Sequence, residues 1–447
     1  MCRLFGADGL QGIALTELTC ELAVQTGRAV VNALTNKSGS RMKILVGKDT
    51  RISSDTLEAA LCAGICSAGA DAELLGTVPI SAVSYLTAKY RADAGIMISP
   101  SHNNAEYNGF KIFSSTGRKL GYETEEKIEE LLAEDADIEP VSRPGRIIRN
   151  DSALDDYKEH IRSAVETDLS GIKIALDCSN GCASVTAAEI FGRLGAEVLL
   201  LSSEPDGVNI NKGCGIAHME TLMSFVSENS CDCGIAFDGD GDRCLAVDEN
   251  GELVDSDKLI AIFAKYYKEQ GRLKDNTAVV SVMTNLGFHG FARDNSIKTV
   301  TASDEYVLEK MLDCGYNLGG SQNGNIFFLD NAVSGDGQLT GVKLLEILKN
   351  SGKKMSELSD IMEKLPQVMM NVRISDKDKE MWKNDGEITG LIEKHMKALG
   401  DSGRIFVRES GSEPMIRIMI EGKEFNKINA MAMEIARKIK ERCALRD

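Results

Sequence analysis

The stretch that decides the fold reads KILVGKDTRISSDTLEAALCAGICSAGADAELLGTVPISAVSYLTAKYRADAGIMI and covers residues 43–98. Its apolar runs predict strands at Lys43–Gly47, Ala72–Leu75 and Ala94–Ile98. The segments between them, Thr56–Ala68 and Ser81–Tyr90, have the apolar spacing of helices. Strands that alternate with helices in this way are typical of layered α/β domains.

The same alternation returns twice further along the chain, at Ile172–Asp177, Val185–Leu194 and Val198–Leu201, and at Ala278–Val282, Leu286–Asp294 and Lys298–Thr301. Residues 67–75 and 193–201 also resemble each other, and both predict a helix end, a glycine turn and a strand. Duplication of a domain explains this similarity, and so does the common way in which α/β units end.

Several polar or proline-bearing stretches suggest domain boundaries, at residues 139–145, 248–251 and 365–366. Beyond the last of them, the pattern predicts long helices around two strands, Ile405–Val407 and Met415–Glu421. A chain of 447 residues is too long for one hydrophobic core, so three or four domains are expected.

The composition is that of a globular protein, with 43% apolar and 27% charged residues and a net charge of −17. The negative charge argues against nucleic acid as a partner, and no apolar run has the length of a membrane helix. Residues 1–12 lack the features of a signal peptide, so a cytoplasmic location is expected. The twelve cysteines and five histidines form no zinc-binding pattern, which favours reduced, mostly buried thiols.

Three aspartates spaced by glycines follow the apolar run Cys233–Phe237, in Phe237-Asp-Gly-Asp-Gly-Asp242-Arg243. Carboxylates that meet at one point repel one another unless a hard cation neutralises them. A calcium loop of the EF-hand kind has similar spacing, but Arg243 stands where that loop needs glycine, and the flanks read as strands. We therefore expect a divalent-cation site at Asp238, Asp240 and Asp242.

A second polar loop follows the strand Ala94–Ile98 and reads Ser99-Pro-Ser-His-Asn-Asn104, with Asn108-Gly-Phe-Lys111 just beyond it. Loops at the carboxyl ends of α/β strands are where ligands tend to bind. Ser101 and His102 are adjacent, but no G-x-S-x-G motif surrounds the serine, so the pattern does not indicate a hydrolase.

Two further loops are polar and contain glycine. Arg408-Glu-Ser-Gly-Ser-Glu-Pro414, with Arg417 beyond it, offers hydroxyls, a glycine and two arginines, which suit a phosphate group. A hairpin turn with surface arginines accounts for it equally well. Leu318-Gly-Gly-Ser-Gln-Asn-Gly-Asn325 is compatible with an ordinary turn, and the chain has no P-loop or dinucleotide fingerprint.

Taken in order along the chain, these four motifs resemble those of the phosphohexomutase superfamily, and within it those of the bacterial phosphoglucosamine mutases. The resemblance covers essentially the whole chain and extends to Phe5-Gly-Ala-Asp-Gly9, Gly47-Lys-Asp-Thr-Arg51 and Glu204-Pro-Asp-Gly-Val-Asn-Ile-Asn211. It implies three similar α/β domains with mixed sheets plus a smaller C-terminal α+β domain around a central cleft.

Each motif would then belong to a different domain. The expected domains are residues 1–153 with a phosphoserine loop, 154–253 with a metal-binding loop, 254–365 with a sugar-recognition loop and 366–447 with a phosphate-binding loop.

The resemblance further implies a phosphosugar mutase that interconverts the 6-phosphate and 1-phosphate of glucosamine, another hexosamine or a hexose. Ser101 would carry the phosphoryl group, and a hexose or hexosamine bisphosphate would serve as intermediate and activator. Mg²⁺ would be bound by Asp238, Asp240, Asp242 and an oxygen of Ser101. The expected partner is a small phosphosugar, and the chain would be a monomer or a homodimer.

The remaining site residues are also implied by the resemblance. His102, Lys111 and Arg243 would join Ser101 in catalysis, with Lys111 as general acid and base. The non-reacting phosphate would be held by Arg408, Ser410, Gly411, Ser412 and Arg417. The sugar would contact Gly320, Ser321 and Asn323.

The sequence departs from the superfamily pattern mainly on the sugar side. Ser321 replaces a glutamate that grips sugar hydroxyls, Asn325 replaces a histidine, Glu305 replaces a basic residue and Gln11 replaces an arginine. In the serine loop, Asn104 stands where proline is usual. An alternative hypothesis is therefore a catalytically impaired paralogue that binds a phosphosugar or a partner protein in a regulatory role.

Overall fold

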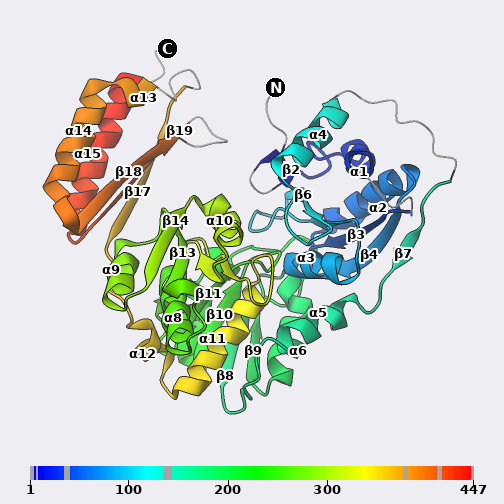
Figure 1. The fold of residues 1–447 in the computed structure, drawn as a ribbon, viewed down its shortest axis with the longest axis horizontal. Helices are drawn as coiled ribbons and strands as arrows, with labels where there is room; N and C mark the ends of the chain where they lie inside the picture. Colours follow the sequence, from blue (N-terminus) through cyan, green and yellow to red (C-terminus); the bar gives the residue numbers. More distant parts are fainter. Residues whose placement is uncertain are drawn as a thin grey trace. The chain divides into compact units, whose positions relative to one another are not determined.

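The computed structural model describes residues 5–6, 9–34, 41–133, 143–375, 381–409 and 415–443, which form four sheets with associated helices (Figure 1). The chain divides into two compact units, which we call unit 1 (residues 1–283 and 295–361) and unit 2 (residues 284–294 and 362–447). Unit 1 holds three mixed sheets, and unit 2 holds the fourth and smallest. The predicted fold class of three α/β domains and a smaller α+β domain is confirmed.

The first sheet has the strand order β1-β2-β6-β5-β3-β4-β7. Its strands are β1 (Phe5–Gly6), β2 (Gly9–Ile13), β3 (Lys43–Lys48), β4 (Asp71–Thr77), β5 (Ala94–Ile98), β6 (Tyr107–Ser114) and β7 (Ile147–Arg149). The helices are α1 (Cys20–Ala33), α2 (Ile52–Ser67), α3 (Ile80–Lys89) and α4 (Tyr122–Ala133). β3, β4, β5 and β7 run parallel, whereas β6 is antiparallel to β5. α1 and α2 share one apolar core with the sheet, and α3 contacts β3 and β5.

The second and third sheets complete unit 1. The second sheet has the strand order β12-β11-β10-β8-β9. Its strands are β8 (Lys173–Asp177), β9 (Glu197–Leu201), β10 (Cys233–Phe237), β11 (Cys244–Asp248) and β12 (Leu253–Val254). The associated helices are α5 (Ala153–Arg162), α6 (Ala187–Arg193) and α7 (Glu220–Glu228). The third, in the order β14-β13-β15-β16, comprises β13 (Thr277–Ser281), β14 (Lys298–Ala302), β15 (Leu318–Gly320) and β16 (Ile326–Phe328), with α8 (Ser256–Glu269) and α10 (Val307–Cys314).

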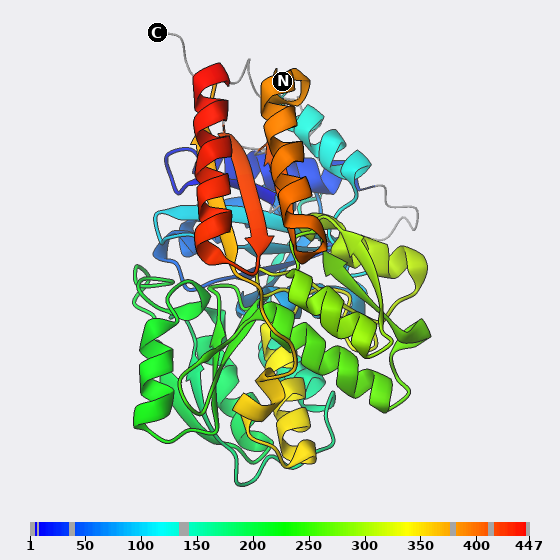
Figure 2. The ribbon, with the colours of Figure 1, turned by 90° about the vertical axis from the view of Figure 1, so that its left-hand side faces the viewer.

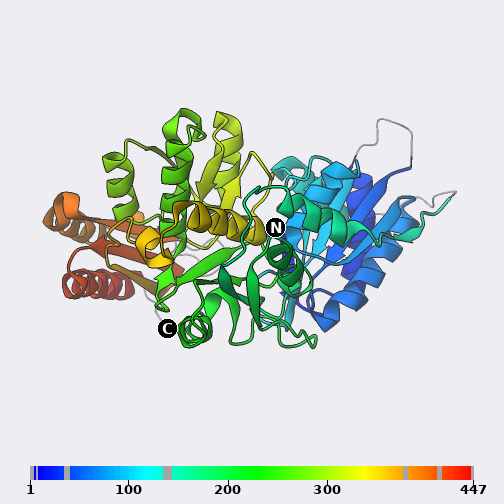
Figure 3. The same ribbon diagram turned by 90° about the horizontal axis from the view of Figure 1, so that it is seen from below.

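The helix α11 (Gly337–Ser351) contacts β10 and β11 of the second sheet as well as α8, and it is the yellow helix near the middle of Figure 3. The Asp336 carboxylate caps it by accepting a hydrogen bond from the Leu339 N–H, and Gly352 follows its end in a left-handed conformation. The short helix α12 (Met355–Ser359) comes next. Of the helices in the described ranges, none has both the length and the apolar character that crossing a bilayer requires.

The two similar sequence stretches adopt the same local structure, as predicted. α2 ends at Ser67 and leads through Gly69 into β4, and α6 ends at Arg193 and leads through Gly195 into β9. Both glycines have positive φ angles, of 91° and 99°, which glycine adopts without a steric penalty.

Unit 2 has its own apolar core beneath the sheet β17-β19-β18. It contains β17 (Gln367–Arg373), β18 (Gly403–Glu409), β19 (Met415–Gly422), α9 (Leu286–Asp294), α13 (Met381–Asn384), α14 (Gly386–Leu399) and α15 (Phe425–Cys443). Figure 2 shows α14 and α15 side by side against these strands. The sequence predicted two strands here, and the structure adds β17, whose buried residues Val368 and Val372 face the core.

Candidate active site

The serine loop begins where β5 ends, so that Ser101 follows a fully buried strand. Ser101 is only 1% exposed, and its backbone N–H donates to Ser99 Oγ at 3.1 Å. Its hydroxyl donates to Asp238 Oδ2 at 2.6 Å, which joins this loop to the aspartate loop across 137 positions of sequence. The candidate phosphoryl carrier and the candidate metal site therefore lie in contact.

The three aspartates occupy the loop between β10 and β11, which pair antiparallel up to Phe237 and Cys244. One carboxylate oxygen from each aspartate lies within 4.8 Å of the other two. Asp240 Oδ1 and Asp242 Oδ1 are buried and have no hydrogen-bond partner among the described residues. Buried carboxylate oxygens that lack donors fit a hard divalent cation, which prefers oxygen ligands.

The three carboxylates of this loop repel one another. Burial and the neighbouring charges of Asp242 and Asp240 raise the pKa of Asp238 well above its ordinary value. Burial also acts to raise the pKa of Asp240, but the Lys111 ammonium, a hydrogen bond with Asp238 and the charge of Arg243 together lower it. Positively charged groups are therefore needed to neutralise the carboxylates of this loop.

Two basic side chains lie beside the aspartates. Lys111 is on β6, which pairs with β5, and its Nζ is 2.8 Å from Asp240 Oδ2. Arg243 Nε lies 3.6 Å from Asp242 Oδ1 and 3.8 Å from Asp238 Oδ2. The structure thus brings together Ser101, both basic residues and the acidic loop, whereas His102 is exposed.

The candidate sugar loop connects β15 to β16 and packs against the aspartate loop. The Cys244 N–H donates to the Gly324 carbonyl at 3.0 Å, and a Cβ on Gly324 would lie 3.2 Å from Arg243 Cβ. Within the loop, the Ser321 hydroxyl donates to Asn323 Oδ1, and the Asn325 N–H donates to the same oxygen at 3.2 Å. Ser321 and Asn323 therefore bond to each other and brace the loop.

Unit 2 carries the candidate phosphate loop. Arg408 on β18 and Arg417 on β19 are directly opposed partners in the antiparallel ladder. Like charges placed opposite each other are destabilising unless an anion or another negative group lies between them. Ser410, Gly411 and Ser412 lie outside the described residues.

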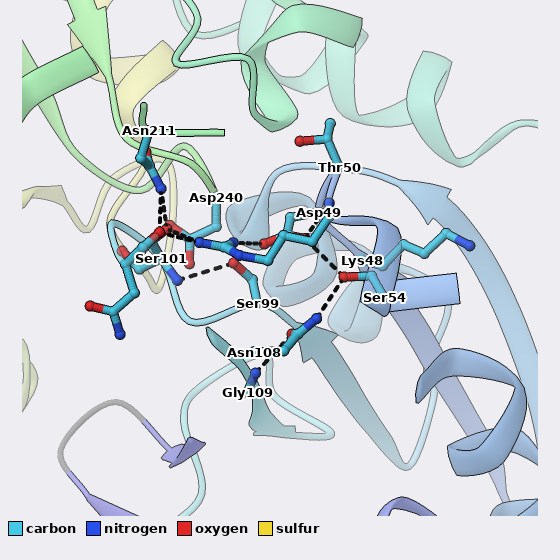
Figure 4. Close-up of polar contacts among 12 residues, drawn as sticks. Lys48, Asp49, Thr50, Ser54, Ser99, Ser101, Asn108, Gly109, Asn211 and Asp240 are labelled. Carbon is cyan, nitrogen blue, oxygen red and sulfur yellow. Dashed lines mark hydrogen bonds and ion pairs between the residues drawn. The ribbon is translucent and has the colours of Figure 1, made fainter. Parts of the chain in front are cut away.

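Sequence reasoning gave no individual role to several residues that hold the serine loop. Arg51 donates to backbone carbonyls of this loop and pairs with Asp49. Asn211 also donates to this loop, at the Ser101 carbonyl (Figure 4). The available signal was their presence in the motifs Gly47–Arg51 and Glu204–Asn211, which mark the resemblance but carry no obvious chemistry.

Comparison with known protein families agrees with this geometry. Models for the phosphoglucomutase/phosphomannomutase family match the chain in order: alpha/beta/alpha domain I at residues 2–139, domain II at 155–251, domain III at 255–365 and the C-terminal domain at 369–438.

Individual relatives match over the full length. A phosphoglucosamine mutase of Clostridium novyi is 49% identical over 450 residues and covers 99% of both chains. One of Acetivibrio thermocellus is 48% identical and covers 99% of this chain and 100% of its own. The crystal structure of a phosphoglucomutase/phosphomannomutase family protein from Burkholderia thailandensis superposes with a TM-score of 0.83 at 24% identity, over 99% of this chain and 98% of that one.

Proposed function

From the membership of this chain in the phosphoglucomutase/phosphomannomutase family, which makes it a phosphosugar mutase, we propose that it interconverts glucosamine 6-phosphate and glucosamine 1-phosphate through a phosphorylated Ser101. The observation that carries the proposal is the 2.6 Å hydrogen bond from Ser101 Oγ to Asp238. A buried serine hydroxyl that faces an acidic loop suits a phosphoryl group shared with a cation.

The donor set suits Mg²⁺. Asp238, Asp240 and Asp242 would hold the ion together with an oxygen of phosphorylated Ser101, in keeping with the preference of Mg²⁺ for carboxylates and phosphate. The bound cation would supply neutralisation of the phosphoryl oxygens.

The protein side chains divide the remaining work in the proposed cycle. The sugar hydroxyl oxygen attacks the phosphorus as the bond between phosphorus and Ser101 Oγ breaks. The Lys111 ammonium gives a proton to the leaving Oγ and takes the hydroxyl proton in its place. In the second transfer, Ser101 Oγ attacks the other phosphorus of the hexosamine bisphosphate as its bond to the sugar oxygen breaks, and Lys111 gives a proton to that sugar oxygen and takes the proton of the Ser101 hydroxyl. Arg243 stabilises the transferring group, because its guanidinium lies beside Asp238 and Asp242.

The non-reacting phosphate is assigned to Arg408 and Arg417 together with Ser410, Gly411 and Ser412. The opposed arginines support this assignment, since planar guanidinium groups recognise phosphate oxygens in pairs. His102 is proposed to assist at the rim of the serine loop, and Gly320, Ser321 and Asn323 are proposed to line the sugar.

The amino sugar is favoured by the full-length relatives, which are phosphoglucosamine mutases. The alternative of an impaired regulatory paralogue is not favoured, because Ser101, the aspartates, Lys111 and Arg243 are all in contact.

A direct test combines a substrate panel with mass spectrometry. Hexose and hexosamine 1- and 6-phosphates are assayed with Mg²⁺ and glucose 1,6-bisphosphate as activator, and the peptide that contains Ser101 is examined for phosphate. We expect turnover of glucosamine phosphates and phosphate on Ser101, both absent in Ser101→Ala. Phosphate on another residue, or turnover that survives in Ser101→Ala, would contradict the assignment.

A further inference from the structure

Ser101 has a backbone conformation that needs external support. Its φ is +58°, in the left-handed region that residues with a Cβ seldom occupy. Such a conformation persists only where the surrounding structure holds it, and it concentrates at functional sites. Ser101 therefore needs contacts with other residues that hold its backbone in place.

Two side chains grip the carbonyl oxygens on either side of His102. The Asn211 amide donates to the Ser101 carbonyl at 2.9 Å and to the Asn103 carbonyl at 3.0 Å. Arg51 Nη2 donates to the Asn103 carbonyl and approaches the Ser101 carbonyl at 3.4 Å. Both donors point at the same pair of oxygens. Figure 4 shows Asn211 beside Ser101, which it reaches across 110 positions of sequence.

The guanidinium of Arg51 is itself fixed. Arg51 and Asp49 have fully buried side chains that form an ion pair. Asp49 also accepts hydrogen bonds from the Arg51 N–H at 3.0 Å and the Ser54 hydroxyl at 2.9 Å. Because its charge is paired and its orientation is set from behind, Arg51 is built to hold a neutral carbonyl group.

The grip also connects to the aspartate loop. Gly239 lies between two of the aspartates, and a Cβ placed on it would lie 2.7 Å from both the Ser101 carbonyl oxygen and the Asn211 amide nitrogen. The aspartate loop therefore packs directly on the gripped carbonyl. Any shift of that carbonyl moves Ser101 Oγ relative to Asp238.

We propose that Arg51 and Asn211 are positioning residues for phosphoryl transfer, which set the place of Ser101 Oγ by clamping the carbonyls of Ser101 and Asn103. This inference rests on the proposed role of Ser101 as phosphoryl carrier. In each turnover Oγ gives up the group and takes it back, so the loop must present the oxygen in the same place twice. A displaced Oγ slows transfer but leaves the binding of phosphosugar intact.

Asn211→Asp tests the clamp. Aspartate has the size of asparagine and also tolerates the left-handed backbone conformation of residue 211. The change replaces the amide donor with a carboxylate, which cannot donate a hydrogen bond to the two carbonyls. The matched control is Asn209→Asp in the same loop, where the lost amide bond goes to the Glu204 carbonyl. Each protein is incubated with glucose 1,6-bisphosphate, and phosphate uptake on Ser101 is followed by mass spectrometry beside kcat and KM. We expect uptake and kcat of Asn211→Asp to fall by about 10- to 100-fold, with KM within twofold, and Asn209→Asp to match the unmodified protein.

Two further variants separate the possible causes. Asn211→Gly removes the donor without adding charge at a positive φ that glycine accepts, and it should show a smaller fall in kcat of the same kind. Arg51→Lys keeps a cation beside Asp49 but loses the planar guanidinium group. This variant should also lower kcat at constant KM. It tests the clamp even if an Asn211 variant does not fold.

The outcomes are distinguishable. Normal phosphate uptake in folded Asn211→Asp and Asn211→Gly overturns the clamp while the role of Ser101 stands, and so does an equal loss in Asn209→Asp. Failure of the unmodified protein to take up phosphate on Ser101 overturns the proposed function, and this inference with it.

Discussion

At the scale of single residues, the two oxygens of the Asp240 carboxylate have different surroundings. One oxygen pairs with Lys111 at 2.8 Å, and the other is buried without a hydrogen-bond donor among the described residues. Asp240→Asn removes a negative ligand from the proposed cation site, so Mg²⁺ affinity should fall by at least about tenfold and phosphoryl transfer should be lost. Titration calorimetry with Mg²⁺ measures this, with the exposed Asp313→Asn as control. Unchanged affinity in Asp240→Asn would mean that the cation binds elsewhere.

The residues whose side chains carry chemistry could be picked from the sequence, because charge and hydroxyl groups in glycine-rich loops are recognisable. The aspartates were picked in this way, whereas Ser101 was noted for its place at a strand end and received its role from the resemblance; the structure places Ser101 in contact with Asp238. Arg51 and Asn211 could not be assigned a role, because they act on backbone carbonyls, which every residue has. Their partners are set only by the tertiary fold.

At the scale of elements, α11 depends on one buried acid. Asp336 caps the helix and accepts hydrogen bonds from the Tyr157 hydroxyl at 3.0 and 3.2 Å. The Gly337 N–H that follows it donates to the Gly241 carbonyl of the aspartate loop at 3.0 Å. Burial raises the pKa of Asp336 from 3.8 to about 6, although these hydrogen bonds act in the opposite direction.

The pH dependence of stability follows from this shift. Between pH 3.8 and about 6 the folded protein keeps a proton that the unfolded chain has lost, so the contribution of Asp336 to the free energy of unfolding falls as pH rises through that window. Asn cannot ionise, so Asp336→Asn should gain about 2 kcal/mol in free energy of unfolding relative to the unmodified protein between pH 4 and pH 7. Urea unfolding of both proteins at the two pH values checks the difference. A constant difference would show that Asp336 is ionised throughout.

The loop between β15 and β16 carries two of the departures from the superfamily pattern, Ser321 and Asn325. Ser321 offers a neutral hydroxyl already bonded to Asn323, so no carboxylate from position 321 faces an amino group on the sugar. Ser321→Glu with Asn325→His should raise kcat/KM for glucosamine 6-phosphate by about tenfold, since charge-assisted hydrogen bonds are stronger than neutral ones. Ser321→Gln with Asn325→His is the uncharged control. Equal rates for both, with a strong preference of the unmodified protein for the amino sugar, would place recognition outside this loop.

Strands and helices with regularly spaced apolar residues were predicted well. The missed strand β17 has a physical explanation. The strands of residues 43–98 and the helix α9 match their predicted places within a few residues. β17 was missed because Gln367–Arg373 follows Pro366 and contains two adjacent methionines, which suit a helix equally well. Its strand conformation comes from the full antiparallel ladder with β19, a contact that no local pattern encodes.

At the scale of the whole molecule, the chain has two units with separate apolar cores. The sequence predicted several domains from length and composition, but it did not predict that residues 284–294 would join the C-terminal part. Glu421 explains this membership, because the buried carboxylate pairs with Arg404 at 2.6 Å and accepts from the Asn285 amide at 2.9 Å. Arg404 in turn donates to the Thr284 carbonyl at 2.6 Å.

Because the cores are separate, we expect unit 2 to unfold without unit 1. Glu421→Ala removes the carboxylate that pairs with the partly buried Arg404, which should cost less than the about 3–5 kcal/mol of a fully buried ion pair broken from one side. The only tryptophan, Trp382, is 8% exposed and lies in unit 2, so its fluorescence reports that unit alone. The urea midpoint by fluorescence should fall in Glu421→Ala, while amide exchange in Cys233–Phe237 of unit 1 keeps its midpoint. The exposed Glu424→Ala is the control, and a joint shift of both midpoints would show that the two cores unfold as one.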